Sequence, residues 1–392
     1  MSPALDRRDL LKLLAAAPVA AQFAAAPPVA AAAGHGILKP LPSDVFTIRG
    51  TNAETNVAAL RDTGLHTPED HFFVRNHTST PVLDESEWKL TVWGSGLRGR
   101  PVEFSYGQLR SLPAVTRTAV VECAGNGRNF YATQQGQPVA GTPWTLGAIG
   151  AASWRGVRLR DVLRRAGIDP SAVHVMPRGL DDPYVSGGVD YGRVRRPLPA
   201  AKALDDVLLA YEMNGEPLPY DHGFPVRVVV PGWIGIASIK WLGDIQVSAT
   251  PLSSPWTTEF YRLFGDAYPA GGSDPIGPQT VKSALELPLG ARLEAGTVHR
   301  LTGRAWSAKA PVSHVEISTD GGAHWRRARL RDTPCRDGWV RWSADWRPRA
   351  AGPAEVLSRT TDRAGNTQPE RSVHNTQGYL FDAVVRHPVT VT

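Results

Sequence analysis

The most informative segment of this chain is TAVVECAGNGR, residues 118–128. Residues 118–122 are mostly β-branched or small and apolar, a composition that predicts a strand. Cys123 follows at the end of this strand, and the two glycines behind it allow the backbone to approach a bulky ligand closely. Arg128, five residues beyond the thiol, can bind an anion beside it. The segment therefore predicts a thiol at a strand end, next to a turn that suits ligand binding.

The residues around Cys123 leave its role open. Its thiolate is a candidate nucleophile or a soft metal ligand. The alternatives are a buried structural thiol, the commoner fate of an isolated cysteine, and a disulfide to Cys335, the one other cysteine. Two cysteines exclude an iron–sulfur ferredoxin and a multi-cysteine zinc ribbon, and no Cys-x-x-Cys-His segment is present to attach a haem.

The length of 392 residues predicts two or three domains with ample hydrophobic core. The net charge of +6 is spread over 43 basic and 37 acidic side chains. This balance suits an anionic substrate or partner, but it is weak support for nucleic-acid binding, so we expect no nucleic-acid partner.

The first residues have the pattern of an export signal. Arg7 and Arg8 precede an Ala/Val/Leu-rich run that ends near residue 33, and adjacent arginines in this context resemble the twin-arginine type. Prolines at positions 18, 27 and 28 interrupt the run, so we expect no membrane-spanning helix. Residues 1–34 therefore predict a twin-arginine export signal and a periplasmic or otherwise exported protein. This export route often carries enzymes that are already folded around a cofactor.

The remaining chain divides into two regions with different patterns. Residues 40–265 mix helix and strand signals, such as helical spacing over residues 159–166 and a β-branched run over residues 226–230. Residues 265–280 are rich in Gly and Pro and predict a linker. Residues 275–388, about 110 in number, alternate short strands with turns and predict an immunoglobulin-like β-sandwich. The expected fold class is α+β, with a mixed catalytic domain followed by the sandwich.

The segment around Cys123 resembles the molybdenum-ligand segment of the sulfite oxidase family. Further segments match that family in order and spacing over roughly residues 45–380. These segments are FFVRNH (72–77), AYEMNG (210–215), DHGFPVR (221–227), VPG (230–232) and KWL (240–242).

This resemblance implies a molybdopterin cofactor, with Cys123 as the single protein ligand to molybdenum. It also implies that the C-terminal sandwich is a dimerisation domain and that the protein is a homodimer. Arg suits bidentate phosphate contacts, whereas Lys acts as a point charge. The cofactor-binding residues implied are Phe73, Asn76, His77, Cys123, His222, Arg227, Ser238 and Lys240.

The resemblance implies a second group of residues around the substrate. A bound oxyanion needs fixed cationic donors in a pocket with little water. The residues implied are Arg75, Arg128, Trp144 and Tyr261, with His77 beside them. Core packing is the alternative for Trp144 and Tyr261, a solvated surface charge for each lone Arg or Lys, and a structural role for His222.

Two positions depart from the family pattern. Gln377 stands where the family usually has a third substrate arginine, and it brings no charge. Ala237 stands where many relatives have an arginine that helps to bind the cofactor. Arg193, Arg195 and Arg196 are candidates to replace that contact, although a surface basic run is the simpler interpretation.

These features predict molybdenum-dependent oxidation of sulfite, or of a related sulfur oxyanion, to sulfate. The electrons would go to a separate acceptor such as a c-type cytochrome, since the chain has no haem motif. Alternatives within the class are the molybdenum subunit of a sulfane-sulfur dehydrogenase, which would suit Gln377, and a sulfoxide reductase. A nitrate reductase is disfavoured because no haem or flavin domain follows. The alternative outside the class is a secreted, non-catalytic Ig-like binding protein with a Cys123–Cys335 disulfide.

Overall fold

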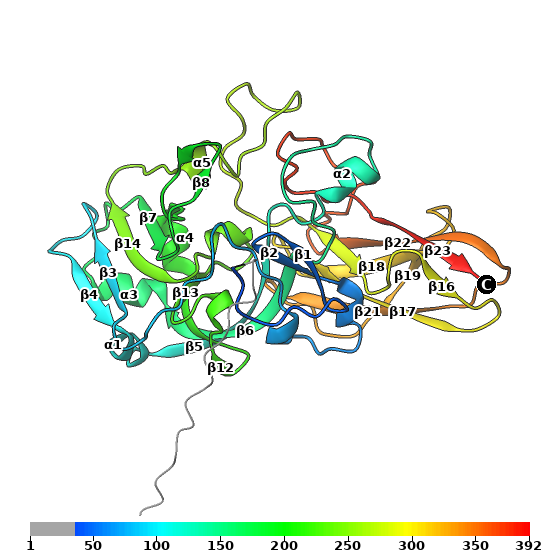
Figure 1. Ribbon diagram of the computed structural model, residues 1–392, viewed down its shortest axis with the longest axis horizontal. Helices are drawn as coiled ribbons and strands as arrows, with labels where there is room; N and C mark the ends of the chain where they lie inside the picture. Colours follow the sequence, from blue (N-terminus) through cyan, green and yellow to red (C-terminus); the bar gives the residue numbers. More distant parts are fainter. Residues whose placement is uncertain (1–35) are drawn as a thin grey trace, which may run out of the picture. The chain divides into compact units, whose positions relative to one another are not determined.

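The computed structural model describes residues 36–392 (Figure 1). The predicted export signal over residues 1–34 therefore lies outside the described part of the chain. The first described elements are a hairpin of β1 (Phe46–Arg49) and β2 (Asn52–Thr55), followed by 3-10 helices over Val57–Leu60 and Glu69–His71. Among the described residues, no helix has the length and apolar character needed to cross a membrane.

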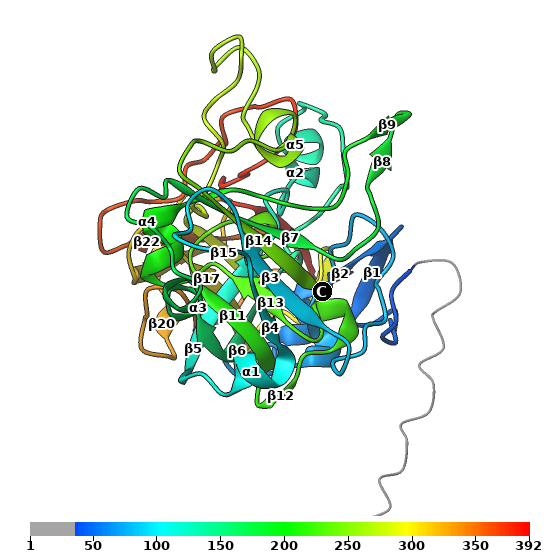
Figure 2. The ribbon, with the colours of Figure 1, turned by 90° about the vertical axis from the view of Figure 1, so that its left-hand side faces the viewer.

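The region up to residue 258 is built on two five-stranded sheets. The first has the order β10-β7-β14-β3-β4, and Figure 2 shows β14, β3 and β4 side by side. Its β14–β3 pair is parallel and its other pairs are antiparallel. The bounds are β3 (Lys89–Trp93), β4 (Val102–Ser105), β7 (His174–Gly179), β10 (Leu198–Pro199) and β14 (Leu242–Ser248).

The second sheet contains the strand that was predicted before Cys123. It has the order β12-β11-β6-β5, with β13 paired to β11, and its pairs are antiparallel. The bounds are β5 (Ala114–Glu122), β6 (Ile149–Arg158), β11 (Leu208–Met213), β12 (Glu216–Pro217) and β13 (Arg227–Val229). The β-branched run over residues 226–230 thus forms the predicted buried strand.

Short helices and a small hairpin complete this region. The predicted helix is present as α3 (Leu159–Arg165), and its buried face packs into the core between the two sheets. It ends before Gly167, whose φ of +83° a residue with a side chain rarely adopts. The other elements are α1 (Tyr106–Arg110), α2 (Asn129–Thr133), α4 (Ala200–Asp205), α5 (Pro255–Thr258), β8 (Val185–Ser186), β9 (Val189–Asp190) and 3-10 helices over Tyr220–His222 and Gly235–Ala237.

The C-terminal region is the predicted β-sandwich. One sheet has the order β15-β17-β21-β20 and the other β16-β23-β22-β18-β19. The predicted hairpin near residue 320 is the antiparallel pair β18–β19. The bounds are β15 (Lys282–Leu285), β16 (Ala291–Leu293), β17 (His299–Trp306), β18 (Val312–Ser318), β19 (Arg326–Arg327), β20 (Arg329–Leu330), β21 (Trp339–Trp346), β22 (Gly352–Asp362) and β23 (Arg386–Val391).

The long connection between β22 and β23 leaves the sandwich and returns to the N-terminal region. In Figure 1 this red segment lies beside α2. The hydroxyl of Tyr131 in α2 donates to the carbonyl oxygen of Val373 at 3.0 Å, and the amide of Leu380 donates to the carbonyl oxygen of Ala124 at 2.8 Å. The returning segment, residues 363–385, therefore contacts the turn that follows Cys123.

Candidate active site

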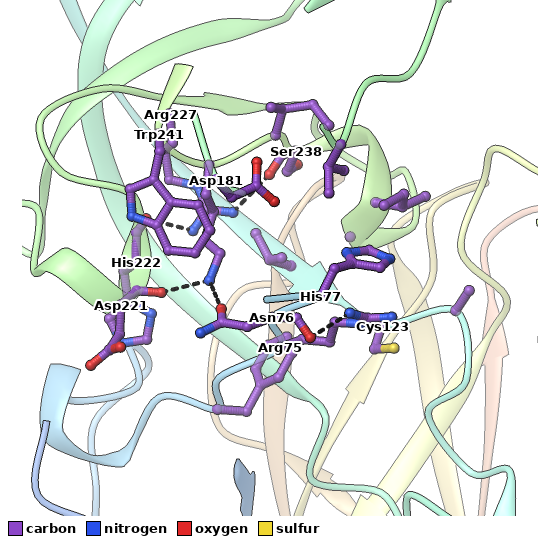
Figure 3. Close-up of a pocket in the computed structure, with 18 of the residues that line it drawn as sticks. Arg75, Asn76, His77, Cys123, Asp181, Asp221, His222, Arg227, Ser238 and Trp241 are labelled. Carbon is purple, nitrogen blue, oxygen red and sulfur yellow. Dashed lines mark hydrogen bonds between the residues drawn. The ribbon is translucent and has the colours of Figure 1, made fainter. Parts of the chain in front are cut away.

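A pocket of about 720 Å³, solvent at its mouth included, lies where the strand end at Cys123 meets the segments around residues 75, 222 and 240 (Figure 3). The residues that the sequence assigned to the site and that line this pocket are Phe73, Arg75, Asn76, His77, Cys123, His222, Arg227, Ser238, Lys240 and Tyr261. Two assigned residues, Arg128 and Trp144, do not line it.

Cys123 is presented to this pocket by the end of β5. Its amide donates to the carbonyl oxygen of Ala148 at 2.9 Å, and its own carbonyl oxygen accepts from the amide of Asn126 at 2.9 Å, which closes the turn. The thiol is half-buried and free, and Cys335 is free and exposed. The alternative of a Cys123–Cys335 disulfide is therefore wrong.

Lys240 is held at the pocket by oxygen atoms from two segments. Its ammonium group donates to the carbonyl oxygen of Asp221 at 2.7 Å and to the side-chain oxygen of Asn76. It also lies 4.1 Å from the ring of Trp241. Burial lowers the pKa of Lys240 well below its ordinary value, and the nearby Arg227 lowers it further. A bound anion would offset this cost, because it favours the charged form.

Arg227 and His222 lie on the same side of the pocket (Figure 3). The guanidinium of Arg227 donates to the carbonyl oxygens of His222 at 3.0 Å and of Ser238 at 3.1 Å. Burial lowers the pKa of Arg227 to about 9 and that of His222 well below its ordinary value, so His222 is neutral. Its Nε2 is buried and has no hydrogen-bond partner within residues 36–392.

His77 lies on the opposite side with Cys123 (Figure 3). The indole nitrogen of Trp256 donates to Nε2 of His77 at 3.1 Å. Because an indole nitrogen can only donate, Nε2 must be the acceptor, and the ring proton of neutral His77 is on Nδ1. Burial, with Arg75 and Lys240 nearby, lowers the pKa of His77 well below its ordinary value.

Asp181 lines the pocket but was missed in the sequence. It is 3% exposed, and its Oδ1 has no hydrogen-bond partner within the described chain. Burial raises its pKa to about 6, although Lys240 opposes the shift. A Cβ on Gly179 would lie 2.4 Å from this oxygen, so only glycine leaves the carboxylate its space. No matched motif contains Asp181. The glycine at position 179 was the one feature of the sequence that could have pointed to it.

The two buried polar atoms that have no partner within the described chain, Oδ1 of Asp181 and Nε2 of His222, indicate what the pocket can hold. A pterin ring has amide and amine hydrogens that suit the carboxylate of Asp181, and acceptor atoms that suit a neutral imidazole such as His222. Lys240 and Arg227 provide positive charge for a phosphate, and the thiol of Cys123 is a soft ligand for a metal. The residues present therefore fit a molybdopterin.

Arg128 lies next to the pocket, in a slot formed by three glycines. A Cβ would lie 2.7 Å from its guanidinium carbon at Gly125, 2.8 Å from Nη1 at Gly141 and 2.8 Å from Cγ at Gly378. Its Nε donates to the carbonyl oxygen of Gln377 at 3.0 Å, and its Nη1 to that of Thr142 at 3.0 Å. The structure therefore fixes this guanidinium tightly, with Nη2 left for another partner.

Two expectations need correction. Arg196 belongs neither to a surface basic run nor to the pocket lining: it is 1% exposed and donates to the carbonyl oxygens of Trp256, at 2.6 Å, and Ile276. Trp144 is also buried, in an apolar cluster against which Cys123 packs, so it supports the thiol from behind. Ala237 is buried and lies outside the pocket lining.

The two regions of the chain match two described domains. Residues 77–256 match the oxidoreductase molybdopterin binding domain, and residues 282–392 match the Mo-co oxidoreductase dimerisation domain. Together with the pocket, these matches define a molybdopterin-binding oxidoreductase. The protein is therefore an enzyme of this class, and the alternative of a non-catalytic Ig-like binding protein is wrong.

Similar proteins define the family more closely. Sulfite oxidase from Gallus gallus is 38% identical over 85% of this chain and 74% of its own length. Mitochondrial sulfite oxidase from Mus musculus is 38% identical over 88% of this chain, which spans only 64% of the mouse protein. The chain belongs to the sulfite oxidase family. The crystal structure of the sulfane dehydrogenase SoxCD from Paracoccus pantotrophus shares the fold, with a TM-score of 0.78 and 24% identity over 97% of this chain and 98% of that one.

Proposed function

We propose that this protein is an exported, homodimeric enzyme that oxidises sulfite to sulfate and passes the electrons to a separate acceptor such as a c-type cytochrome. The observation that carries the proposal is the meeting of Arg75, Cys123 and Tyr261 at one pocket with Lys240 and Arg227. The twin-arginine pattern over residues 1–34 supports export. The match to a dimerisation domain supports the homodimer.

In this proposal, the molybdenum cofactor supplies oxygen-atom transfer and two-electron redox chemistry when it is bound. Cys123 holds the metal, Lys240 and Arg227 hold the phosphate, and Asp181 and His222 hold the pterin.

Arg75 and Arg128 bind and orient the substrate anion. Burial alone would lower the pKa of Arg75, but Tyr261 and Cys123 nearby outweigh it and raise the pKa, so Arg75 stays charged. Burial raises the pKa of Tyr261, so its hydroxyl stays protonated and can donate a hydrogen bond to the substrate.

The second candidate is oxidation of a sulfane sulfur. It is favoured by Gln377, whose side-chain nitrogen donates to the carbonyl oxygen of Glu259 at 3.0 Å and brings no third positive charge to the site.

A steady-state assay separates the two candidates. Molybdenum-loaded protein should reduce ferricyanide or cytochrome c when sulfite is added, and much more slowly with thiosulfate. If the molybdenum-loaded protein does not oxidise sulfite, the first proposal is contradicted. Turnover of thiosulfate alone supports the second.

A further inference from the structure

Tyr379 lies on the returning segment and packs against a tyrosine that lines the candidate active site, although it does not line the pocket itself. It is 8% exposed, and its ring stacks on that of Tyr261 with centroids 5.1 Å apart and planes 10° apart. Tyr261 itself lines the pocket. The sandwich half of the chain therefore contributes an aromatic side chain directly behind an active-site tyrosine.

The side chain of Asn375 binds both backbone polar groups of Tyr379. The side chain of Asn375 accepts from its amide at 2.9 Å and donates to its carbonyl oxygen at 2.8 Å. The residues before and after it, Gly378 and Leu380, have φ values of +61° and +54°. A left-handed leucine costs conformational energy and persists where the surroundings over-determine it, often at functional sites. The chain thus holds Tyr379 in one orientation against this cost.

Tyr379 also contacts the arginine expected to bind substrate. The guanidinium carbon of Arg128 lies 5.2 Å from the centre of its ring, a cation–π geometry. The carbonyl oxygen of Gln377 accepts from Arg128, while the side chain of Gln377 is occupied by Glu259. At the position where the family usually carries a third cation, this chain therefore has Gln377, whose side-chain amide is already hydrogen-bonded to Glu259. Two residues later it has the phenol side chain of Tyr379.

The environment of the phenol keeps it protonated. Burial, followed by the proximity of Tyr261, raises the pKa of Tyr379 above its ordinary range, and Cys123 acts in the same direction. The hydroxyl thus keeps its proton and is able to donate a hydrogen bond. Within the described chain, the contacts of Tyr379 run through its backbone and the faces of its ring.

We propose that Tyr379 is a specificity-determining residue of the substrate pocket, and that its hydroxyl donates a hydrogen bond to the bound sulfur oxyanion where the third cation is missing. The inference rests on the proposed function, since it assumes that the anion binds beside Arg75 and Arg128.

The test measures binding of sulfate, a non-reacting oxyanion, to the molybdenum-loaded protein by isothermal titration calorimetry. Tyr379→Phe should weaken sulfate binding about tenfold, because it removes one hydrogen bond to a charged group. It should raise KM for sulfite by a similar factor with little change in kcat. Tyr106→Phe is the matched control: Tyr106 is also 8% exposed but lies in α1, and its variant should bind sulfate normally.

A second variant guards against a purely structural effect. Adding Gln377→Arg to Tyr379→Phe should restore sulfate affinity, since the new cation replaces the lost donor, whereas a packing defect would persist. Sulfate affinity that stays within twofold in Tyr379→Phe, or wild-type protein that binds no sulfate, overturns the inference. Wild-type protein that binds sulfate but does not oxidise sulfite contradicts the proposed function instead, and Tyr379→Phe still decides the role of the tyrosine.

Discussion

The ammonium group of Lys282 lies 2.8 Å from a carboxylate oxygen of Glu122, and both side chains are 3% exposed. Lys282 begins β15 of the sandwich, whereas Glu122 immediately precedes Cys123. Lys282 also donates to the carbonyl oxygen of Asn126 at 3.1 Å, and the indole of Trp306 donates to the second oxygen of Glu122 at 3.0 Å. The sandwich thus contacts the residues on both sides of Cys123.

Breaking this pair should destabilise the protein and its cofactor site together. Lys282→Met leaves the buried Glu122 carboxylate without an opposite charge, which typically costs about 3–5 kcal/mol. We expect a lower unfolding temperature by calorimetry and a lower molybdenum content by elemental analysis. The double variant Glu122→Gln/Lys282→Met removes both charges and should recover much of the stability. Equal stability of Lys282→Met and wild type would show that the pair contributes little.

The two cysteines should respond differently to the same substitution. Cys123→Ser replaces the soft thiolate with a hard hydroxyl and should abolish sulfite oxidation, with far-ultraviolet circular dichroism unchanged. Cys335→Ser is the matched control, since this thiol is exposed and does not line the pocket. Wild-type turnover in Cys123→Ser would remove the thiol from the reaction.

Arg75 should contribute mainly to substrate affinity. Arg75→Gln keeps a polar side chain but removes the charge, and we expect KM for sulfite to rise at least about tenfold, equivalent to about 1.4 kcal/mol. Arg110→Gln is a suitable control, because its side chain is half exposed and outside the pocket lining. An unchanged KM in Arg75→Gln would exclude this arginine from the anion site.

Lys39 should make stability depend on alkaline pH. Its ammonium group donates to the carbonyl oxygens of Glu69, at 3.0 Å, and Phe72, and burial lowers its pKa from 10.5 to about 7. Between these values the unfolded chain binds more protons than the folded one, so the free energy of unfolding rises with pH. Below pH 7 both states are protonated and the cost of burial is fully present.

Relative to Lys39→Met, the wild type should therefore gain up to about 1.4 kcal/mol of stability per pH unit between pH 7.5 and about 9.5. Urea unfolding at several pH values measures this difference. Lys89→Met is the control, since Lys89 is exposed and its variant should follow the wild type. Parallel curves for wild type and Lys39→Met would contradict the lowered pKa.

The fold was predictable where its signals are local. The helical spacing over residues 159–166, the β-branched run around Val228 and the turn at Asp320 each predicted an element that is present. The parallel pairing of β14 with β3 and the return of residues 363–385 were not predicted. These pairings join segments far apart in the chain, and their register is set by packing that no local pattern records.

The site residues that lie in or beside the matched segments could be predicted from the sequence. Asp181 was missed because it stands outside the matched segments, and because burial and an oxygen without a partner, rather than neighbouring residues in the sequence, give it its chemistry. Arg196 was misjudged for the opposite reason. A run of arginines suggests a solvated surface, yet two carbonyl oxygens inside the core accept from its guanidinium.

The glycine slot around Arg128 can form only after residues 377 and 378 have been synthesised. Gln377 and Gly378 provide one side of that slot, and Gln377 lies 249 residues beyond Arg128 in the chain. While the ribosome is still adding those residues, every sequence motif of the cofactor site through Lys240 can already exist without a finished pocket. A nonsense mutation before residue 377 would therefore yield a chain that has every matched motif through Lys240 but lacks the complete slot around Arg128.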